Sequence, residues 1–301
     1  MIVAMLMMAA AVARQSEDIH QRILTALGPD ADRRAEALMQ EKRFADVEAM
    51  VKASAASKQE ILALMGCLEF LDGRVQLAAQ YLVQAQQMAD LRESDRFTLA
   101  MAWVRAGSDE DARKELSQLA AQQPGKSLYA YWLGRIDYDE RRYAAAVEHL
   151  KTATHLEPTS ARAWDSLGLA YDMQGQTEEA LKAFAEAVSR NRAAPHGTAW
   201  PPNDLGSLLL RVGETKKAEA ALREALEFDP QMPEAHYHLG RALEKDGANE
   251  EAVTQYLAAV QGDKNATEAC YSLAQLYRKM GKEQESAEMF SEWRKRRDAA
   301  R

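Results

Sequence analysis

The sequence predicts an all-α fold, an α-solenoid built from about eight helical hairpins. The first observation is composition: Ala, Leu, Glu, Gln, Arg and Lys dominate the 301 residues, and these residues lose little on entering a helix. Only 8 prolines and 15 glycines interrupt them. The second observation is a pattern that returns every 34 residues from residue 59 onward, with one interval of 38. A period of this length is typical of stacked helical hairpins.

The repeat is defined by the size of the side chains in its columns. The aligned segments begin at Gln59, Glu93, Ser127, Ala161, Ala199, Pro233 and Thr267. Position 8 is always small: Gly66, Ala100, Gly134, Gly168, Gly206, Gly240 and Ala274. Position 20 is Ala or Ser, while positions 7 and 24 are large and apolar. We expect the small residues at positions 8 and 20 to face each other, with the large side chains filling the space on either side.

Turn residues mark where each helix of a hairpin ends. Position 15 is glycine in six of the seven segments, and Arg141 is the exception. Glycine at this point supplies the positive φ that ends a helix without a steric penalty. Position 32 is proline in three segments (Pro124, Pro158 and Pro230), which stops the second helix. The array of hairpins is therefore expected to occupy residues 59–301.

Residues 14–58 are expected to form an N-terminal segment that carries one degenerate hairpin as a cap. Its helices fall between residues 34 and 54, and Lys42 stands where the glycine would be. At the other end, Trp293 replaces a small residue and marks an atypical terminal hairpin. The basic residues 294–297 there suit the negative end of a helix. Four extra residues after the segment that starts at 161 predict a loop insertion near 191–202; a continuous solenoid is favoured over two hinged domains.

Residues 1–13 form an apolar run that ends in Ala-Val-Ala before Arg14, as in a secretory signal peptide. No basic residue precedes the run, and thirteen residues are too few to span a bilayer, which takes about 20. We expect an exported protein, periplasmic or secreted, with no membrane span in the mature chain. A mis-chosen start codon or a frayed apolar helix is the alternative, and the protein would then be cytoplasmic.

Residues 161–171, which read Ala-Arg-Ala-Trp-Asp-Ser-Leu-Gly-Leu-Ala-Tyr, continue through Gly175, Ala180, Phe184 and Ala187. This pattern resembles the tetratricopeptide repeat, and the resemblance extends over about residues 59 to 298. The resemblance implies a right-handed solenoid in which positions 2, 5, 9, 12 and 13 of each first helix line a concave groove. Transferred to this sequence, these positions give Tyr131, Arg135, Tyr138, Arg162, Asp165, Leu169, Asp172, Trp200, Asn203, Ser207, Arg211, Tyr237, Arg241, Glu244, Tyr271, Gln275 and Arg278.

Aromatic and arginine side chains recur along this stripe, as they do at interface hot spots. We therefore predict a non-catalytic, bacterial-type scaffold or adaptor that binds a protein or peptide segment in the groove. Trp200 is ambiguous, because beside two prolines it could pack the irregular loop instead. The alternative is an interaction module of a larger enzyme system, such as the partner of a glycosyltransferase or kinase. The oligomeric state is left open.

Other chemistries find little support. A net charge of −8 disfavours nucleic-acid binding. Gly125-Lys126-Ser127 resembles part of a phosphate loop but follows a predicted helix and lacks the first glycine. The histidines are not paired at metal-ligand spacing, so no metal or cofactor is expected. Cys67 and Cys270 lie six hairpins apart, too far for a disulfide.

Overall fold

The structure, a computed structural model, describes residues 19–28, 31–263 and 266–299. Within these ranges the chain forms α-helices joined by turns and contains no strand, so the predicted fold class is confirmed. The predicted signal peptide, residues 1–13, lies outside the described residues. The chain divides into two units, residues 1–136 and 137–301, and the boundary falls inside α8 (Ser127–Asp139). Each unit is described by itself.

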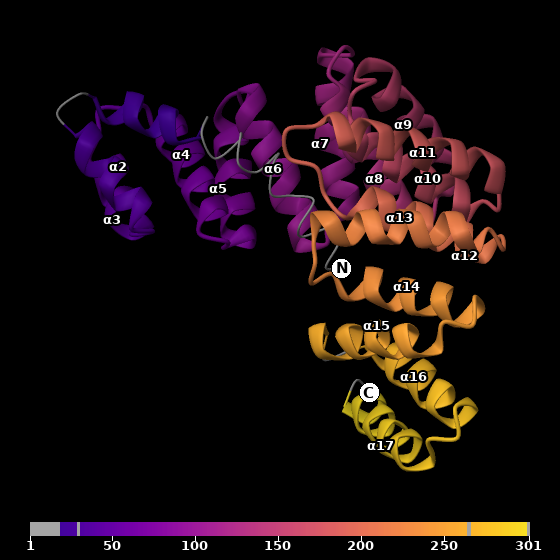
Figure 1. The fold of residues 1–301 in the computed structure, drawn as a ribbon. Helices are drawn as coiled ribbons and strands as arrows, with labels where there is room; N and C mark the ends of the chain where they lie inside the picture. The colour runs from indigo at the N-terminus through magenta and orange to yellow at the C-terminus, as the bar shows by residue number, and fades with distance from the viewer. Residues whose placement is uncertain (1–18, 29–30, 264–265, 300–301) are drawn as a thin grey trace. The chain divides into compact units, whose positions relative to one another are not determined.

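Among the described residues of unit 1, the first helical segment covers residues 19–27, which the repeat pattern did not predict. The helices that follow contact one another in chain order, from α2 to α7, and α4 also contacts α6. This succession of neighbours is how stacked hairpins bury their apolar faces. Figure 1 labels them: α2 (Asp32–Gln40), α3 (Phe44–Lys52), α4 (Lys58–Leu71), α5 (Val75–Met88), α6 (Glu93–Ala106) and α7 (Asp109–Gln122).

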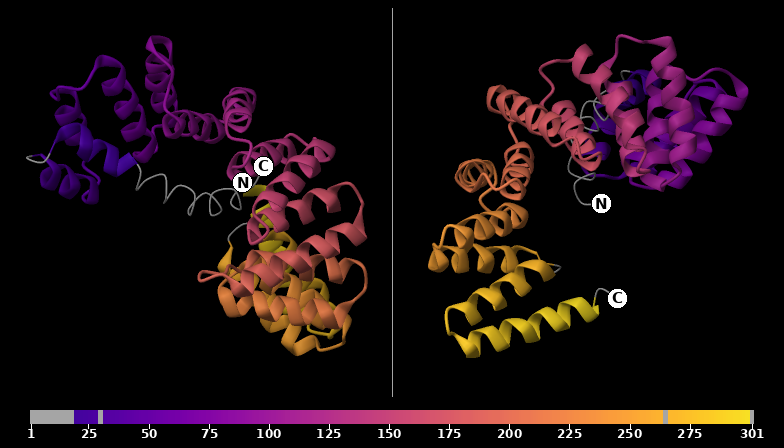
Figure 2. Two further views of the ribbon diagram at one scale, coloured as in Figure 1. Left: turned by 90° about the horizontal axis from the view of Figure 1, so that it is seen from above. Right: turned by 90° about the vertical axis from the view of Figure 1, so that its right-hand side faces the viewer.

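The second unit continues the same arrangement. Each helix from α9 to α17 packs on the next, and α12 also contacts both α10 and α14. Figure 2 shows α14 to α17 as successive stacked rods in orange and yellow. The helices of this unit are α9 (Tyr143–Leu156), α10 (Ala161–Met173), α11 (Thr177–Ala193), α12 (Trp200–Arg211), α13 (Thr215–Phe228), α14 (Pro233–Lys245), α15 (Asn249–Gly262), α16 (Thr267–Lys279) and α17 (Glu283–Ala299).

The small residue at position 8 allows the two helices of a hairpin to touch. A Cβ atom added to Gly168 would lie 2.6 Å from the Phe184 ring, and one added to Gly206 would lie 2.6 Å from Cγ of Leu222. These distances are well inside van der Waals contact. The side chain at position 24 therefore lies directly over the glycine, rather than beside it as the sequence suggested.

The turn inside each hairpin has a left-handed residue at position 15. Gly107, for example, has φ 76°, and Arg141 adopts φ 60° at the same place. Lys42, in the degenerate hairpin, has φ 57°. A non-glycine residue pays about 1–2 kcal/mol for this conformation, so the turn geometry and not the residue type decides the backbone here.

The four extra residues lengthen α11 as well as the connection that follows it. Helix α11 has 17 residues where α13 has 14, and Trp200 opens α12 with prolines in its first turn. Proline fits there because the first helical N–H groups need no partner. The Asn191 side chain, which is buried, donates to the Thr198 carbonyl and accepts from the Thr198 N–H, both at 2.8 Å. These two hydrogen bonds hold the connection between residues 194 and 199 in place.

His238 is a partly buried titratable group of α14. Its Nδ1 atom is buried and has no hydrogen-bond partner. Burial is the main cause that lowers the pKa of His238 to about 4, and the nearby positive charge of Arg241 adds to it. The imidazole is therefore neutral in the folded protein at pH 7.

We predict that Gly168→Ala destabilises the protein by about 1–3 kcal/mol, because the new methyl group would overlap the Phe184 ring. This is the opposite of the usual effect in a helix, where Ala is favoured over Gly by about 0.5–1 kcal/mol. Urea unfolding followed by far-UV circular dichroism measures the change. Gly125→Ala is the control, since no atom lies within 4 Å of its added Cβ. Equal stability of the two variants would contradict the packing described above.

We also predict that stability decreases as the pH falls from 6.5 towards 4. The pKa of His238 is lowered on folding, so the unfolded chain binds a proton that the folded chain does not. The loss at pH 5 is about 2 kcal/mol relative to pH 7.5. His238→Gln should remove that part of the pH dependence, while His196→Gln, at an exposed loop position, should keep it. Identical pH profiles for the wild type and His238→Gln would show that His238 does not contribute.

Candidate functional site

The first helices of unit 2 form one row, because α12 contacts both α10 and α14. Helix α16 is connected to α14 by an ion pair, in which Lys279 Nζ lies 4.0 Å from a Glu244 carboxylate oxygen. We call the side chains at the predicted groove positions of these four helices the first-helix face. It comprises Arg162, Asp165, Leu169, Asp172, Trp200, Asn203, Ser207, Arg211, Tyr237, Arg241, Glu244, Tyr271, Gln275 and Arg278.

At α10 and α12 two residues of this face are closed to solvent, and others are only partly exposed. Asp165 and Asn203 are buried, and Leu169 packs against the cluster around Phe184. The accessible feature is an ion pair between successive hairpins, in which the exposed Arg211 guanidinium meets the half-buried Asp172 carboxylate. This end of the face therefore presents the Arg211–Asp172 ion pair to solvent, beside the buried Asp165 and Asn203 side chains.

At α14 aromatic and charged side chains are held by their neighbours. The Arg241 guanidinium carbon lies 5.6 Å from the centre of the Tyr237 ring, a cation–π distance. The Tyr237 ring in turn lies 6.1 Å from that of Tyr256. The Tyr256 hydroxyl donates to Glu244 at 3.0 Å. Burial, and then the charge of Glu244, raise the pKa of Tyr256, so the hydroxyl remains a donor and fixes the carboxylate.

At α16 the aromatic side chain is open to solvent. Tyr271 is 42% exposed, and its ring lies 5.4 Å from that of Trp293 and 5.8 Å from that of Phe290. Gln275 Nε2 donates to the Tyr271 hydroxyl at 2.8 Å, and Arg278 donates to Gln275 Oε1 at 2.6 Å. These hydrogen bonds hold the Tyr271 hydroxyl and the Arg278 guanidinium in position, and both side chains stay accessible to solvent.

Three further predicted groove residues, Tyr131, Arg135 and Tyr138, belong to α8, inside which the unit boundary falls. Tyr131 and Arg135 belong to unit 1 and are buried, with Tyr131 edge-on to Trp132 at 5.5 Å. Tyr138 lies in unit 2 and contacts Tyr143 instead. Trp200 is half-buried and packs against a cluster that includes Ala225 and Ala235, one of the two roles that its sequence context allowed.

The sequence missed the part that Tyr256 and Lys279 play in positioning Glu244. Tyr256 stands at position 24, where four of the seven segments have Leu. The column as a whole indicates only apolar packing. A tyrosine in place of leucine was the available signal, since a buried tyrosine hydroxyl usually finds a partner.

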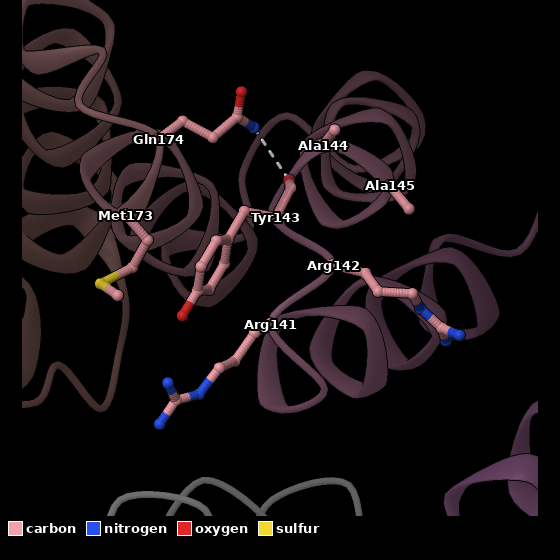
Figure 3. A pocket seen from close by; sticks show the side chains of 7 residues that line it. All are labelled: Arg141, Arg142, Tyr143, Ala144, Ala145, Met173 and Gln174. Carbon is pink, nitrogen blue, oxygen red and sulfur yellow. Dashed lines mark hydrogen bonds between the residues drawn. The ribbon is translucent and has the colours of Figure 1, made fainter.

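A pocket of about 480 Å³ lies at the ends of α9 and α10, and none of its lining residues is at a first-helix face position. Gln174 Nε2 donates to the Tyr143 carbonyl at 2.9 Å across it. Figure 3 shows the Arg142 side chain turned away from the Tyr143 ring; its guanidinium lies 2.9 Å from Asp137. The lining residues include no carboxylate, histidine or thiol, the groups that most often carry acid–base or nucleophilic chemistry.

Residues 19–28, 31–263 and 266–299 contain no group of three or more His, Cys, Asp or Glu side chains placed to hold a metal ion. None of the helices in those ranges is long and apolar enough to cross a bilayer.

Comparison with known proteins agrees with the repeat architecture. Models of the tetratricopeptide repeat match residues 159–231, 203–269 and 267–292. Cellulose synthase operon protein C of Pseudomonas fluorescens is 27% identical over 197 residues, which cover 61% of this chain and 15% of that protein. Cytochrome c-type biogenesis protein CycH of Bradyrhizobium diazoefficiens is 28% identical over 118 residues, or 37% and 31% of the two chains. The chain therefore spans less than a third of the length of either relative.

Solved structures share the fold at low sequence identity. A tetratricopeptide repeat protein from Parabacteroides merdae has a TM-score of 0.61 at 14% identity, covering 86% of this chain and 98% of the other. The APC/C hetero-tetramer Cut9–Hcn1 gives 0.60 at 15% identity, covering 81% and 54%. Together, the matched repeat models and the stacked hairpins show that the chain belongs to the tetratricopeptide repeat family.

Proposed function

We propose that this repeat scaffold binds a peptide or protein segment on the first-helix face of unit 2 and has no catalytic role of its own. The observation that supports this most strongly is the pair of arrangements at α14 and α16. Arg241 and Arg278 are held by neighbouring side chains, and Tyr271 is exposed. Tyrosine and arginine are enriched at interface hot spots. A binding surface that is already ordered loses less entropy when a partner docks.

The charges of the face indicate what kind of segment fits. Arg241 and Arg278 alternate with the carboxylates of Glu244 and Asp172, so neither sign dominates. A polyanion would be repelled by those carboxylates and by the net charge of −8. A peptide that presents both a carboxylate and an apolar or aromatic side chain suits the face better.

A second candidate is a role as the interaction module of an enzyme system. The similarity to a protein named for the cellulose synthase operon favours this candidate. In that case the partner on the face would itself be an enzyme, for example a glycosyltransferase or kinase. Identification of the cross-linked protein in the experiment below distinguishes the two candidates.

We predict that a photo-cross-linking residue placed at Tyr271 captures a protein partner in cells, whereas the same residue at Phe228 does not. The two positions are matched, since Tyr271 is 42% and Phe228 is 38% exposed, but Phe228 is on the second helix α13. Mass spectrometry identifies the cross-linked product. Equal capture of the same proteins from both positions would argue against a binding role for the first-helix face.

In the same experiment, Arg241→Ala combined with Arg278→Ala should lower the cross-linking yield at Tyr271 by about tenfold or more, because each truncated hot-spot residue commonly costs over 1 kcal/mol. The control is Arg192→Ala with Arg223→Ala, two exposed arginines of second helices that pair with Glu224 and Glu251. An undiminished yield in the first variant, with unchanged circular dichroism, would remove these arginines from the binding site.

A further inference from the structure

The helix over residues 19–27 is amphipathic, and its apolar side is buried. Ile19 is 1% exposed and Ile23 is 0% exposed, while Gln21 and Thr25 face solvent. Residues three and four apart share one side of a helix, so Arg22 lies on the same side as Ile19.

Arg22 shows where this helix docks. Its guanidinium pairs with Asp95 of α6 and, at 3.1 Å, with Glu60 of α4. Burial acts to lower the pKa of Arg22, but the attraction of Asp95 and Glu60 outweighs it and raises the pKa. Arg22 therefore keeps its charge and connects the docked helix to the first helices of two successive hairpins.

The docked helix covers the face of unit 1 that corresponds to the first-helix face of unit 2. Glu60 stands at position 2 of its hairpin, and Cys67, at position 9, has its Sγ 3.5 Å from the Asp95 carboxylate that holds Arg22. In unit 1 the position-9 residues Cys67, Met101 and Arg135 are 0%, 2% and 7% exposed. In unit 2 every position-9 residue is partly exposed: Leu169, Ser207, Arg241 and Gln275.

We propose that the helix over residues 19–27 is an intramolecular ligand of the first helices α4 and α6. We propose also that this face accepts, in its place, an amphipathic helix of a protein partner. The helix that is bound defines the kind of partner. It presents an arginine that reaches two carboxylates, flanked on the same side by two aliphatic residues one turn apart.

This inference goes beyond the function proposed for unit 2, because it assigns a second surface with a different chemistry. Here the ligand must supply a cation and two aliphatic side chains. The intramolecular helix competes with any such partner, so the measured affinity equals the intrinsic affinity multiplied by the fraction of molecules in which the helix is released.

Cys67 provides a probe of release in the intact protein. In the Arg22→Glu variant, repulsion from Asp95 and Glu60 should release the helix and open the buried thiol to iodoacetamide. We expect Cys67 to react at least tenfold faster than in the wild type, as followed by peptide mass spectrometry. Cys270, also buried but in α16, should react at its wild-type rate. Arg33→Glu, an exposed arginine in α2, is the matched control and should change neither rate.

The other outcomes contradict the proposal. An unchanged Cys67 rate in Arg22→Glu, and also in Ile19→Ala/Ile23→Ala, would show that the helix does not cover this face. A parallel increase at Cys67 and Cys270 in both variants would show that the helix is a fixed part of the folded core and not a replaceable ligand.

A second arm tests whether the face accepts a separate helix. A synthetic peptide of residues 17–28, added to the Arg22→Glu protein, should slow the labelling of Cys67 back towards the wild-type rate. The same peptide with Glu in place of Arg22 should need at least a tenfold higher concentration to slow the labelling of Cys67 equally. Absence of protection by the unmodified peptide, or equal protection by both, would overturn the assigned partner chemistry.

Discussion

The contact between the small residue at position 8 and the large side chain at position 24 determines the rest of this structure. Where Gly168 meets Phe184 and Gly206 meets Leu222, the two helices of a hairpin approach to the limit that van der Waals radii allow. This close contact fixes how each hairpin presents its two helices to the next. The first helices of unit 2 then lie side by side, and their side chains form one surface from residues far apart in sequence.

Repetition explains why the fold was predictable from one sequence. A 34-residue period implies identical local packing problems, and each copy is independent evidence for the same solution. The helix over residues 19–27 lies outside the period, so the repeat gave no information about it. Its own signal, Ile19, Ile23 and Leu27 four residues apart followed by Gly28, is only two turns long. That length does not distinguish a docked helix from a coil segment without knowledge of what it packs against.

The candidate site was predictable in position but not in exposure. The register places a side chain on the first-helix side, but its accessibility depends on neighbours from other hairpins. Asp165 and Asn203 have the same register as Tyr237 and Tyr271, yet the first two are buried. Only the tertiary contacts separate them. In physical terms, periodicity determines the direction of a side chain, whereas packing between hairpins determines what covers it.

Charge gives the reason why the two units differ in what they can bind. In unit 1 the Asp95 carboxylate is buried, and Glu60 lies close enough to share the same guanidinium. Removing one partner of a buried ion pair costs about 3–5 kcal/mol, because the remaining charge is left without compensation. Any segment that displaces the helix over residues 19–27 must therefore bring its own cation to Asp95. An arginine suits this place better than a lysine, since its planar fork can donate to two carboxylates at once. At the first-helix face of unit 2, the accessible carboxylates of Asp172 and Glu244 are already paired with Arg211 and Lys279.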